Sequence, residues 1–390
     1  MSNSIENVLI LQGGGSLGAF GCGVFKALAN NNIKIDIVAG TSIGGVNAAI
    51  IAGGKQNEHP EKVLEQYWLE LAEASTTSSD SGDANLNFPQ HSPSKEDTKL
   101  TRISQAKSTM SFYGSALHGN KKVFVPRWKP EYWFTDPQYF APNDWTYLYD
   151  HSPLVKTAEK YIDYNKLQPN GNPNARLIIT AVNVLTAEPL IFDSAKQQIT
   201  AKHLLAATGY PTYYFPWIEV EKGVYAWDGS LLSNTPLREV IDASPVKDKR
   251  IFLVENYPKN IDKLPSNLQE VQHRARDIMF SDKTMHNVQM SKAITYYLRL
   301  IDDLYKMLEE RFDSENSNKE DKQKFEDIQA RYKKVSEEHG SEIKAVHYIT
   351  RSEPFPSLYE NADFSLGAIK NSIKDGEIKT NQILKKEISK

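Results

Sequence analysis

Two glycine-rich turns near the start of the sequence contain residues whose types and spacing suit nucleophilic chemistry. The second, Gly40-Thr41-Ser42-Ile43-Gly44, fits the G-x-S-x-G pattern, in which a serine lies on a strained turn between a strand and a helix. Only small neighbours, here Gly40 and Gly44, let the backbone double back and lift the serine Oγ clear of a sheet. The pattern therefore indicates Ser42 as a candidate nucleophile.

The first turn, Gly13-Gly14-Gly15-Ser16-Leu17-Gly18, follows an apolar run at 8–12. Glycines adopt backbone angles that other residues resist, and the helix expected from about residue 17 adds the positive end of its dipole, so the turn predicts an anion-binding loop. The same residues also fit G-x-G-x-x-G. A dinucleotide site, however, needs an acidic residue at the far end of the second strand, where this chain has the serine turn.

A third candidate, Asp228, begins the Asp228-Gly229-Ser230 turn after a short strand expected at 224–227. An aspartate on a tight turn at the end of a strand is well placed to enter a cleft. Alone the motif has little weight, because Asp-Gly is a common turn.

Strands and helices alternate along the part of the chain that must position these residues. Apolar runs and helical spacing predict strands at 8–12, 36–39, 176–183, 190–192, 224–227 and 250–255, and helices from about 17 and at 44–54, 60–74, 153–164 and 201–207. Both glycine-rich turns follow the carboxyl ends of strands, where open α/β sheets bind ligands.

The order of these motifs resembles the patatin-like phospholipase family. The glycine run, the serine turn, the Ala206 to Pro216 segment and the Asp228 turn follow one another as in that family, over about Val8 to Glu255. The resemblance implies a three-layer α/β/α fold with a mainly parallel central sheet. The rest of the chain resembles a bacterial subgroup with an additional C-terminal helical region.

The same resemblance implies a serine acyl hydrolase, a lipid esterase or phospholipase of the A type, with a Ser-Asp dyad. Ser42 is then the nucleophile, Asp228 the general base, and the amides of Gly13, Gly14 and Gly15 the oxyanion hole. A carboxylate within hydrogen-bond reach can take a serine proton directly, and one oxyanion donor contributes about 10²–10³ in rate.

The remaining motif glycines, which are Gly18, Gly40, Gly44 and Gly229, support these turns. Two features depart from the family pattern. Ser16 and Leu17 replace a basic residue that members often carry in the glycine loop, and Ser230 replaces the usual glycine or alanine after Asp-Gly. Neither change removes a catalytic atom. We expect no metal and no cofactor, because the sequence has no H-E-x-x-H motif and no EF-hand loop.

Two other functions stay open from the sequence alone. One is a soluble acyl esterase, thioesterase or acyltransferase with a Ser-His-Asp triad, since four histidines follow Asp228, namely His273, His286, His339 and His347. The other is a non-catalytic scaffold or binding protein. Measured hydrolysis and its dependence on single histidines distinguish them.

Length and composition exclude further classes. The chain has 390 residues and a net charge of −3, which argues against a general nucleic-acid binder. Its single cysteine, Cys22, cannot form an internal disulfide, and we expect it in the core. No signal peptide and no run of about 20 apolar residues is present, so we expect a cytoplasmic protein, with peripheral membrane contact as an open alternative.

We expect a catalytic domain over 1–260 and a mainly helical region over 261–390 packed on it. A polar segment at about 75–110 cannot bury enough apolar surface and predicts a mobile insertion. The aromatic, proline-rich segment at 112–145 is either an irregular loop over the core or a patch that meets lipid. The periodicity at 294–312 and 325–335 predicts a helical hairpin with a structural role, a homodimer contact being the alternative. A strand at 343–350 and a helix at 364–384 follow.

Overall fold

The computed structural model describes residues 5–55, 59–73, 117, 119–281, 283–312, 319–353 and 357–388. The insertion expected at about 75–110 lies outside these residues. Among the described helices, none combines the length and apolar character needed to cross a lipid bilayer.

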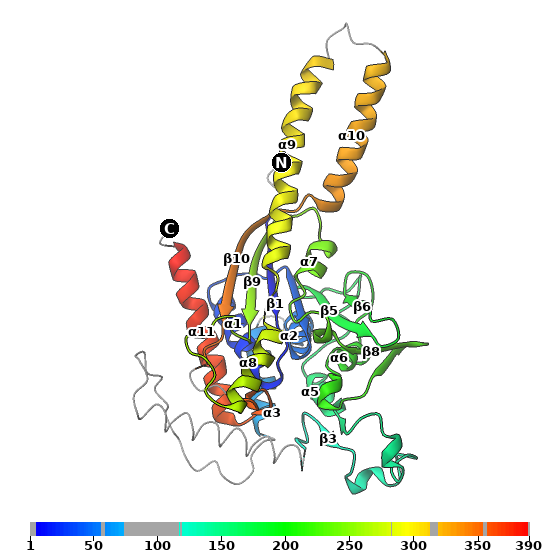
Figure 1. The fold of residues 1–390 in the computed structure, drawn as a ribbon, viewed down its shortest axis with the longest axis vertical. Coiled ribbons are helices and arrows are strands. Elements are labelled where there is room, and N and C mark those ends of the chain that lie inside the picture. The colour runs from blue at the N-terminus through cyan, green and yellow to red at the C-terminus, as the bar shows by residue number, and fades with distance from the viewer. Residues whose placement is uncertain are drawn as a thin grey trace.

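One mixed sheet forms the centre of the molecule (Figure 1), and its strand order is β10-β9-β1-β2-β5-β8-β7, with β6 also paired to β5. The strands are β1 (Glu6–Leu11), β2 (Ile37–Thr41), β5 (Arg176–Asn183), β6 (Pro189–Asp193), β7 (Ile218–Glu221), β8 (Val224–Asp228), β9 (Lys249–Glu255) and β10 (Ile343–Thr350). Pairing from β10 through β5 is parallel, and β6, β7 and β8 pair antiparallel. The predicted mainly parallel sheet is confirmed.

Helices cover both faces of this sheet because the parallel strands are apolar on both faces. The described helices are α1 (Ala19–Asn30), α2 (Ile43–Gly53), α3 (Pro60–Glu73), α5 (Ser152–Ala158), α6 (Ala201–Ala207), α7 (Leu237–Ala243), α8 (Leu268–Phe280), α9 (Met285–Phe312), α10 (Lys319–His339) and α11 (Leu366–Ile388). Leu9 and Leu11 of β1 pack in one core with α1, α2, α3 and α11, whereas Val8 and Ile10 pack in a second core with α7 and the start of α9. The predicted three layers are confirmed.

The C-terminal elements complete this body. Strand β10 pairs with β9 at one edge of the sheet, and α11 lies along α1 (Figure 1). The two helices approach closely at Gly23 and Gly376, where an added Cβ would lie 1.8 Å from Ile373 O and 2.3 Å from Phe20 O. Cys22 of α1 is fully buried, as expected.

The predicted helical hairpin is confirmed as α9 and α10, which project from one end of the body (Figure 1). Tyr305 of α9 stacks on Phe325 and Tyr332 of α10. The helix predicted at 153–164 is wrong in length. It ends at Ala158, because the chain then turns so that Ile162 forms a β-bridge with Gly54.

Candidate active site

Ser42 lies between β2 and α2, in a backbone conformation that non-glycine residues rarely adopt, with φ of 55° and ψ of −130°. The flanking glycines permit this turn. A Cβ on Gly40 would lie 2.2 Å from Gly44 C, and one on Gly44 would lie 2.2 Å from Leu11 O. Ser42 is partly exposed while both residues beside it are buried, so the turn presents its side chain at the surface of the body.

Asp228 ends β8 and is fully buried. Its Oδ1 accepts hydrogen bonds from Ser230 N at 2.9 Å and Ser230 Oγ at 2.8 Å. Its Oδ2 has no hydrogen-bond partner that meets normal geometry within the described residues. Burial raises the pKa of Asp228 to about 6, although the Ser42 hydroxyl and Ser230 act on the carboxyl in the opposite direction.

The sheet brings Ser42 and Asp228 to the same place. Thr41 pairs with Thr180 of β5, and Asp228 pairs with the next residue of that strand, Ala181. The hydroxyls of Thr41 and Thr180 are 2.9 Å apart. Gly229 lies against Thr180, whose O and Oγ1 would each be 2.7 Å from an added Cβ. Because β5 pairs with both β2 and β8, this register brings Ser42, the residue after Thr41, next to Asp228. The Ser42 hydroxyl interacts with the Asp228 carboxyl there.

The glycine loop contacts Ser42 directly, because a Cβ on Gly13 would lie 2.7 Å from Ser42 Cβ. The amide of Gly13 donates to Asn234 Oδ1 at 2.9 Å and is therefore occupied. Gly14 and Gly15 have positive φ values of 142° and 59° and are partly exposed. Within the described residues, the amides of Gly14 and Gly15 donate no hydrogen bond. Gly18 packs on Ile43 beneath the loop.

A buried polar network behind the loop was not predicted. Gln12 Nε2 donates to Thr235 Oγ1 at 2.9 Å, and the Asn256 side chain donates to Gln12 O at 3.1 Å and Gly13 O at 3.0 Å. With Asn234, these residues fix the backbone of the loop at Gln12 and Gly13. The polar Ser233-Asn234-Thr235 run, which begins four residues after Gly229, was the available sequence signal.

The segment that follows β10 also supports the loop. Ser16 Oγ donates to Glu360 O at 2.7 Å, and Asn361 O would lie 2.3 Å from a Cβ on Gly15. These contacts come from a short helical turn, η6 (Glu360–Ala362). Asn361 Nδ2 in turn donates to Tyr213 Oη at 2.8 Å. We call residues 357–363 the C-terminal strap.

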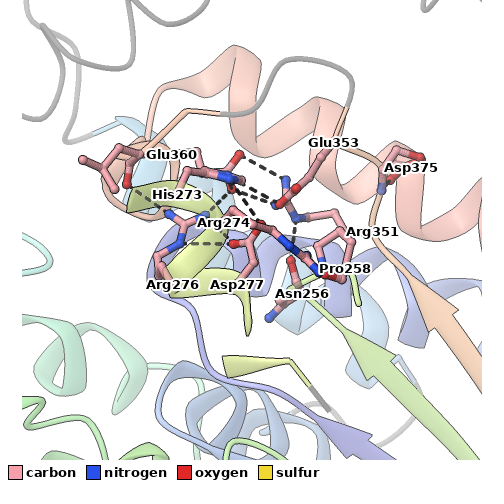
Figure 2. Close-up of polar contacts among 12 residues, drawn as sticks. Asn256, Pro258, His273, Arg274, Arg276, Asp277, Arg351, Glu353, Glu360 and Asp375 are labelled. Carbon is pink, nitrogen blue, oxygen red and sulfur yellow. Dashed lines mark hydrogen bonds and ion pairs between the residues drawn. The ribbon is translucent and has the colours of Figure 1, made fainter. Parts of the chain in front are cut away.

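A cluster of buried charges anchors the C-terminal strap (Figure 2), with side chains from α8 and from the chain after β10 pointing toward one another. Glu360 Oε1 accepts hydrogen bonds from Arg276 and Arg351, each at 2.8 Å, and lies 3.2 Å from His273 Nε2. Burial disfavours the Glu360 charge, but Arg351 and then His273 outweigh it and hold the pKa of Glu360 far below its usual range.

Three members of this cluster, His273, Asp277 and Glu353, offer ligand atoms within 4.8 Å of one another. Arg276 donates to Asp277 Oδ1 at 3.0 Å, and Arg351 pairs with Glu353. Because the two guanidinium groups already balance these carboxylates, a divalent cation placed here would face two fixed positive charges. Within the described chain, these groups are better suited to a structural ion-pair network than to a metal site.

Within the described residues, no hydrogen bond or ion pair joins a histidine to Ser42 or Asp228. His273 belongs to the charge cluster, and His347 of β10 pairs with Glu387. His151 Nε2 donates to Leu205 O at 2.8 Å. The arrangement around Ser42 therefore offers a carboxyl, and no described imidazole, as its proton acceptor.

Comparison with known proteins gives one family match. The family model described as "Patatin-like phospholipase" matches residues 9–241. No curated protein matches the chain.

Solved structures give distant matches. VipD from Legionella pneumophila is 13% identical, with 98% of this chain and 67% of that chain covered and a TM-score of 0.36. Two structures of ExoU with SpcU from Pseudomonas aeruginosa are each 17% identical over 69% of this chain. They have TM-scores of 0.27 and 0.28, and the match spans 47% and 46% of their length. The chain thus matches about two thirds of the first structure's length and just under half of the others'.

Proposed function

The chain belongs to the patatin-like phospholipase family, and we propose that it is a lipid acyl hydrolase that uses a Ser42-Asp228 dyad. The observation that carries this proposal is the position of Ser42. It lies on a strained turn beside a buried carboxylate, one oxygen of which has no hydrogen-bond partner that meets normal geometry within the described chain. Two charge-assisted bonds from Ser230 orient that carboxylate.

In the first half of the reaction, Ser42 Oγ attacks the ester carbonyl carbon while Asp228 accepts the hydroxyl proton. The oxyanion that forms needs donors that are fixed and unoccupied before reaction. We assign this role to the amides of Gly14 and Gly15. Gly13, expected in the same role, instead donates to Asn234 and positions the loop.

In the second half, the intermediate collapses, the carbon–oxygen bond to the alcohol breaks, and the alcohol leaves with the proton held by Asp228. Asp228 then takes a proton from water as that water attacks the acyl-enzyme, and returns it to Ser42 Oγ as the acyl–oxygen bond breaks and the fatty acid is released. No step requires a metal or a cofactor. The histidine-triad alternative is less supported, because no described histidine contacts Ser42 or Asp228.

The test compares wild type, Ser42→Ala and Asp228→Asn on phospholipid vesicles, lysophospholipid and short-chain esters, with released acid identified by mass. We expect both variants to lose activity by a factor of about 10⁴ or more, because members of a catalytic unit fail together. A fluorophosphonate probe should label wild type and leave Ser42→Ala unlabelled. The matched control is Asp242→Asn on α7, whose side chain is exposed.

Two results would contradict the dyad. One is activity of Asp228→Asn within tenfold of wild type, and the other is a single histidine variant as inactive as Ser42→Ala. A folded protein that neither hydrolyses esters nor reacts with the probe would support the non-catalytic alternative.

A further inference from the structure

The loop between the short strands β3 (Val125–Pro126) and β4 (Tyr149–Asp150) exposes large aromatic side chains. We call residues 127–148 the aromatic loop. Phe134 is 96% exposed, Phe140 78% and Trp133 48%. Tyr139 contacts both Trp133 and Phe140, with ring centroids 6.0 and 5.0 Å apart. Contiguous exposed apolar groups of this size on a soluble surface indicate an interaction site.

The aromatic loop is held in shape from within. Arg127 is buried, pairs with Asp136 at 2.5 Å and lies over the rings of Trp145 and Tyr147 at 4.9 and 4.4 Å. Further bonds join Trp145 Nε1 to Gln138 O and Tyr139 Oη to Trp128 O. Since the buried arginine organises the loop, its phenylalanines project from a preformed support.

The base of the aromatic loop connects to the candidate active site. Leu148 N donates to Tyr214 O at 2.9 Å, and Tyr149 packs on Phe215. A few residues earlier in the same segment, Gly209 O accepts the amide of Asp228 at 3.1 Å. Leu231 and Leu232, just after Asp228, are also exposed, at 40% and 51%. An apolar surface bound by the loop would therefore lie next to the residues assigned to catalysis.

We propose that the aromatic loop inserts Phe134 and Phe140 into the surface of a zwitterionic lipid bilayer. Both side chains are exposed over most of their surface, which suits insertion into a fluid apolar phase, and Trp and Tyr favour the bilayer interface. Apart from the Arg127–Asp136 pair, the charged residues of the loop are Lys129, Glu131 and Asp144, so the loop itself has no excess of positive charge to attract anionic lipid. The inference deepens the proposed function by naming a bilayer surface as the place where substrate is met, and its test needs no turnover.

The experiment measures co-flotation with phosphatidylcholine vesicles in the Ser42→Ala background, so that vesicles are not consumed. We expect adding Phe134→Ser and Phe140→Ser to lower the vesicle partition coefficient by at least about tenfold, because each phenylalanine loses its burial in lipid. The matched control replaces two exposed aromatic residues of the hairpin, Tyr296→Ser and Tyr297→Ser, and should bind like the parent. Circular dichroism and thermal melting establish that each variant is folded.

Three results would overturn the proposal: no binding by the folded parent, equal binding by the phenylalanine variant, or an equal loss in the hairpin control. Binding that requires anionic lipid and disappears with salt would also overturn it, since insertion is not screened. Failure of the proposed function is a separate result. It would show as an inactive wild type that still binds vesicles through Phe134 and Phe140.

Discussion

Burial of the Asp228 carboxyl lowers the free energy of unfolding at neutral pH, because burial disfavours the charge that this group carries there. Burial raises its pKa to about 6 against the pull of Ser42 and Ser230, whereas an aspartate in an unfolded chain has a pKa of about 3.9. Between these values the folded protein binds a proton that the unfolded protein has released. Stability therefore falls as pH rises from about 4 to 6, and stays lower above pH 6.

Asp228→Asn should remove this cost together with the activity. We expect the variant to be more stable than wild type by roughly 2–3 kcal/mol at pH 8 and to show little difference at pH 4, because the neutral amide has no charge to desolvate. Urea denaturation at the two pH values measures the difference. The exposed control Asp242→Asn should show no such pH dependence. A loss of stability at pH 8, or a gain equal at both pH values, would contradict this account.

The local part of the site could be predicted from sequence, and the distant part could not. Ser42 with its glycines is one short segment whose backbone strain is visible in the residue types, and Asp228 is recognisable once the motif order is known. The partner of the Gly13 amide, Asn234, lies 221 residues away and has an ordinary side chain. Only the fold shows that the Gly13 amide has an acceptor and that, among the described residues, the Gly14 and Gly15 amides have none.

At the scale of elements, periodicity predicted strands and helices well where each buries a regular face, as in β5 or α9. It failed at 153–164, because the bridge between Ile162 and Gly54 replaces the second half of the expected helix. Periodicity also did not show which strand pairs with the one predicted at 343–350. In the structure this strand is β10, and it pairs with β9 at the edge of the central sheet. The residues of the C-terminal strap show no helical or strand periodicity, because buried ion pairs of Glu360 determine where the strap lies.

Glu360→Gln tests whether the C-terminal strap positions the glycine loop. The substitution removes the negative charge of Glu360, to which both Arg276 and Arg351 donate, and the strap that supports Ser16 and Gly15 would loosen. We expect kcat on a short-chain ester to fall about tenfold with little change in KM, because the loss falls on oxyanion stabilisation. Breaking a buried pair should also lower stability by about 3 kcal/mol.

The matched control is Glu387→Gln on α11, which removes an acceptor from Arg250 and His347 without touching the glycine loop. It should reduce stability and leave kcat near wild type. If both variants lower kcat in proportion to their loss of stability, the strap has only a structural role.

At the scale of the whole molecule, the body and the hairpin differ in what supports them. The start of α9 is held by Val288 in the second core, and Arg299 pairs with Glu342 near the base. Farther out, α9 exposes Leu304 and Met307, at 52% and 68%. By contrast, α11 covers α1 along its length. The hairpin is therefore separable from the body, and α11 is not.

Replacing residues 301–333 by a Gly-Ser linker of about six residues should leave short-chain ester hydrolysis within about twofold of wild type, because the described part of the hairpin projects from the end of the body (Figure 1). The melting temperature should change by only a few degrees. Deleting 366–388, which removes α11, should instead give an insoluble or unfolded protein. Loss of ester hydrolysis in a folded, soluble hairpin variant would contradict this division.

The contact between Ser16 and Glu360 spans 344 residues of sequence, and this separation has a consequence during translation. As the chain leaves the ribosome, the glycine loop and α1 emerge early, while β10, the C-terminal strap and α11 are made last. Until then the sheet has an unpaired edge at β9, and the face of α1 that packs against α11 has no cover, which are conditions that favour aggregation. The proposed site, whose glycine loop contacts the C-terminal strap, is therefore completed only after synthesis has passed residue 360.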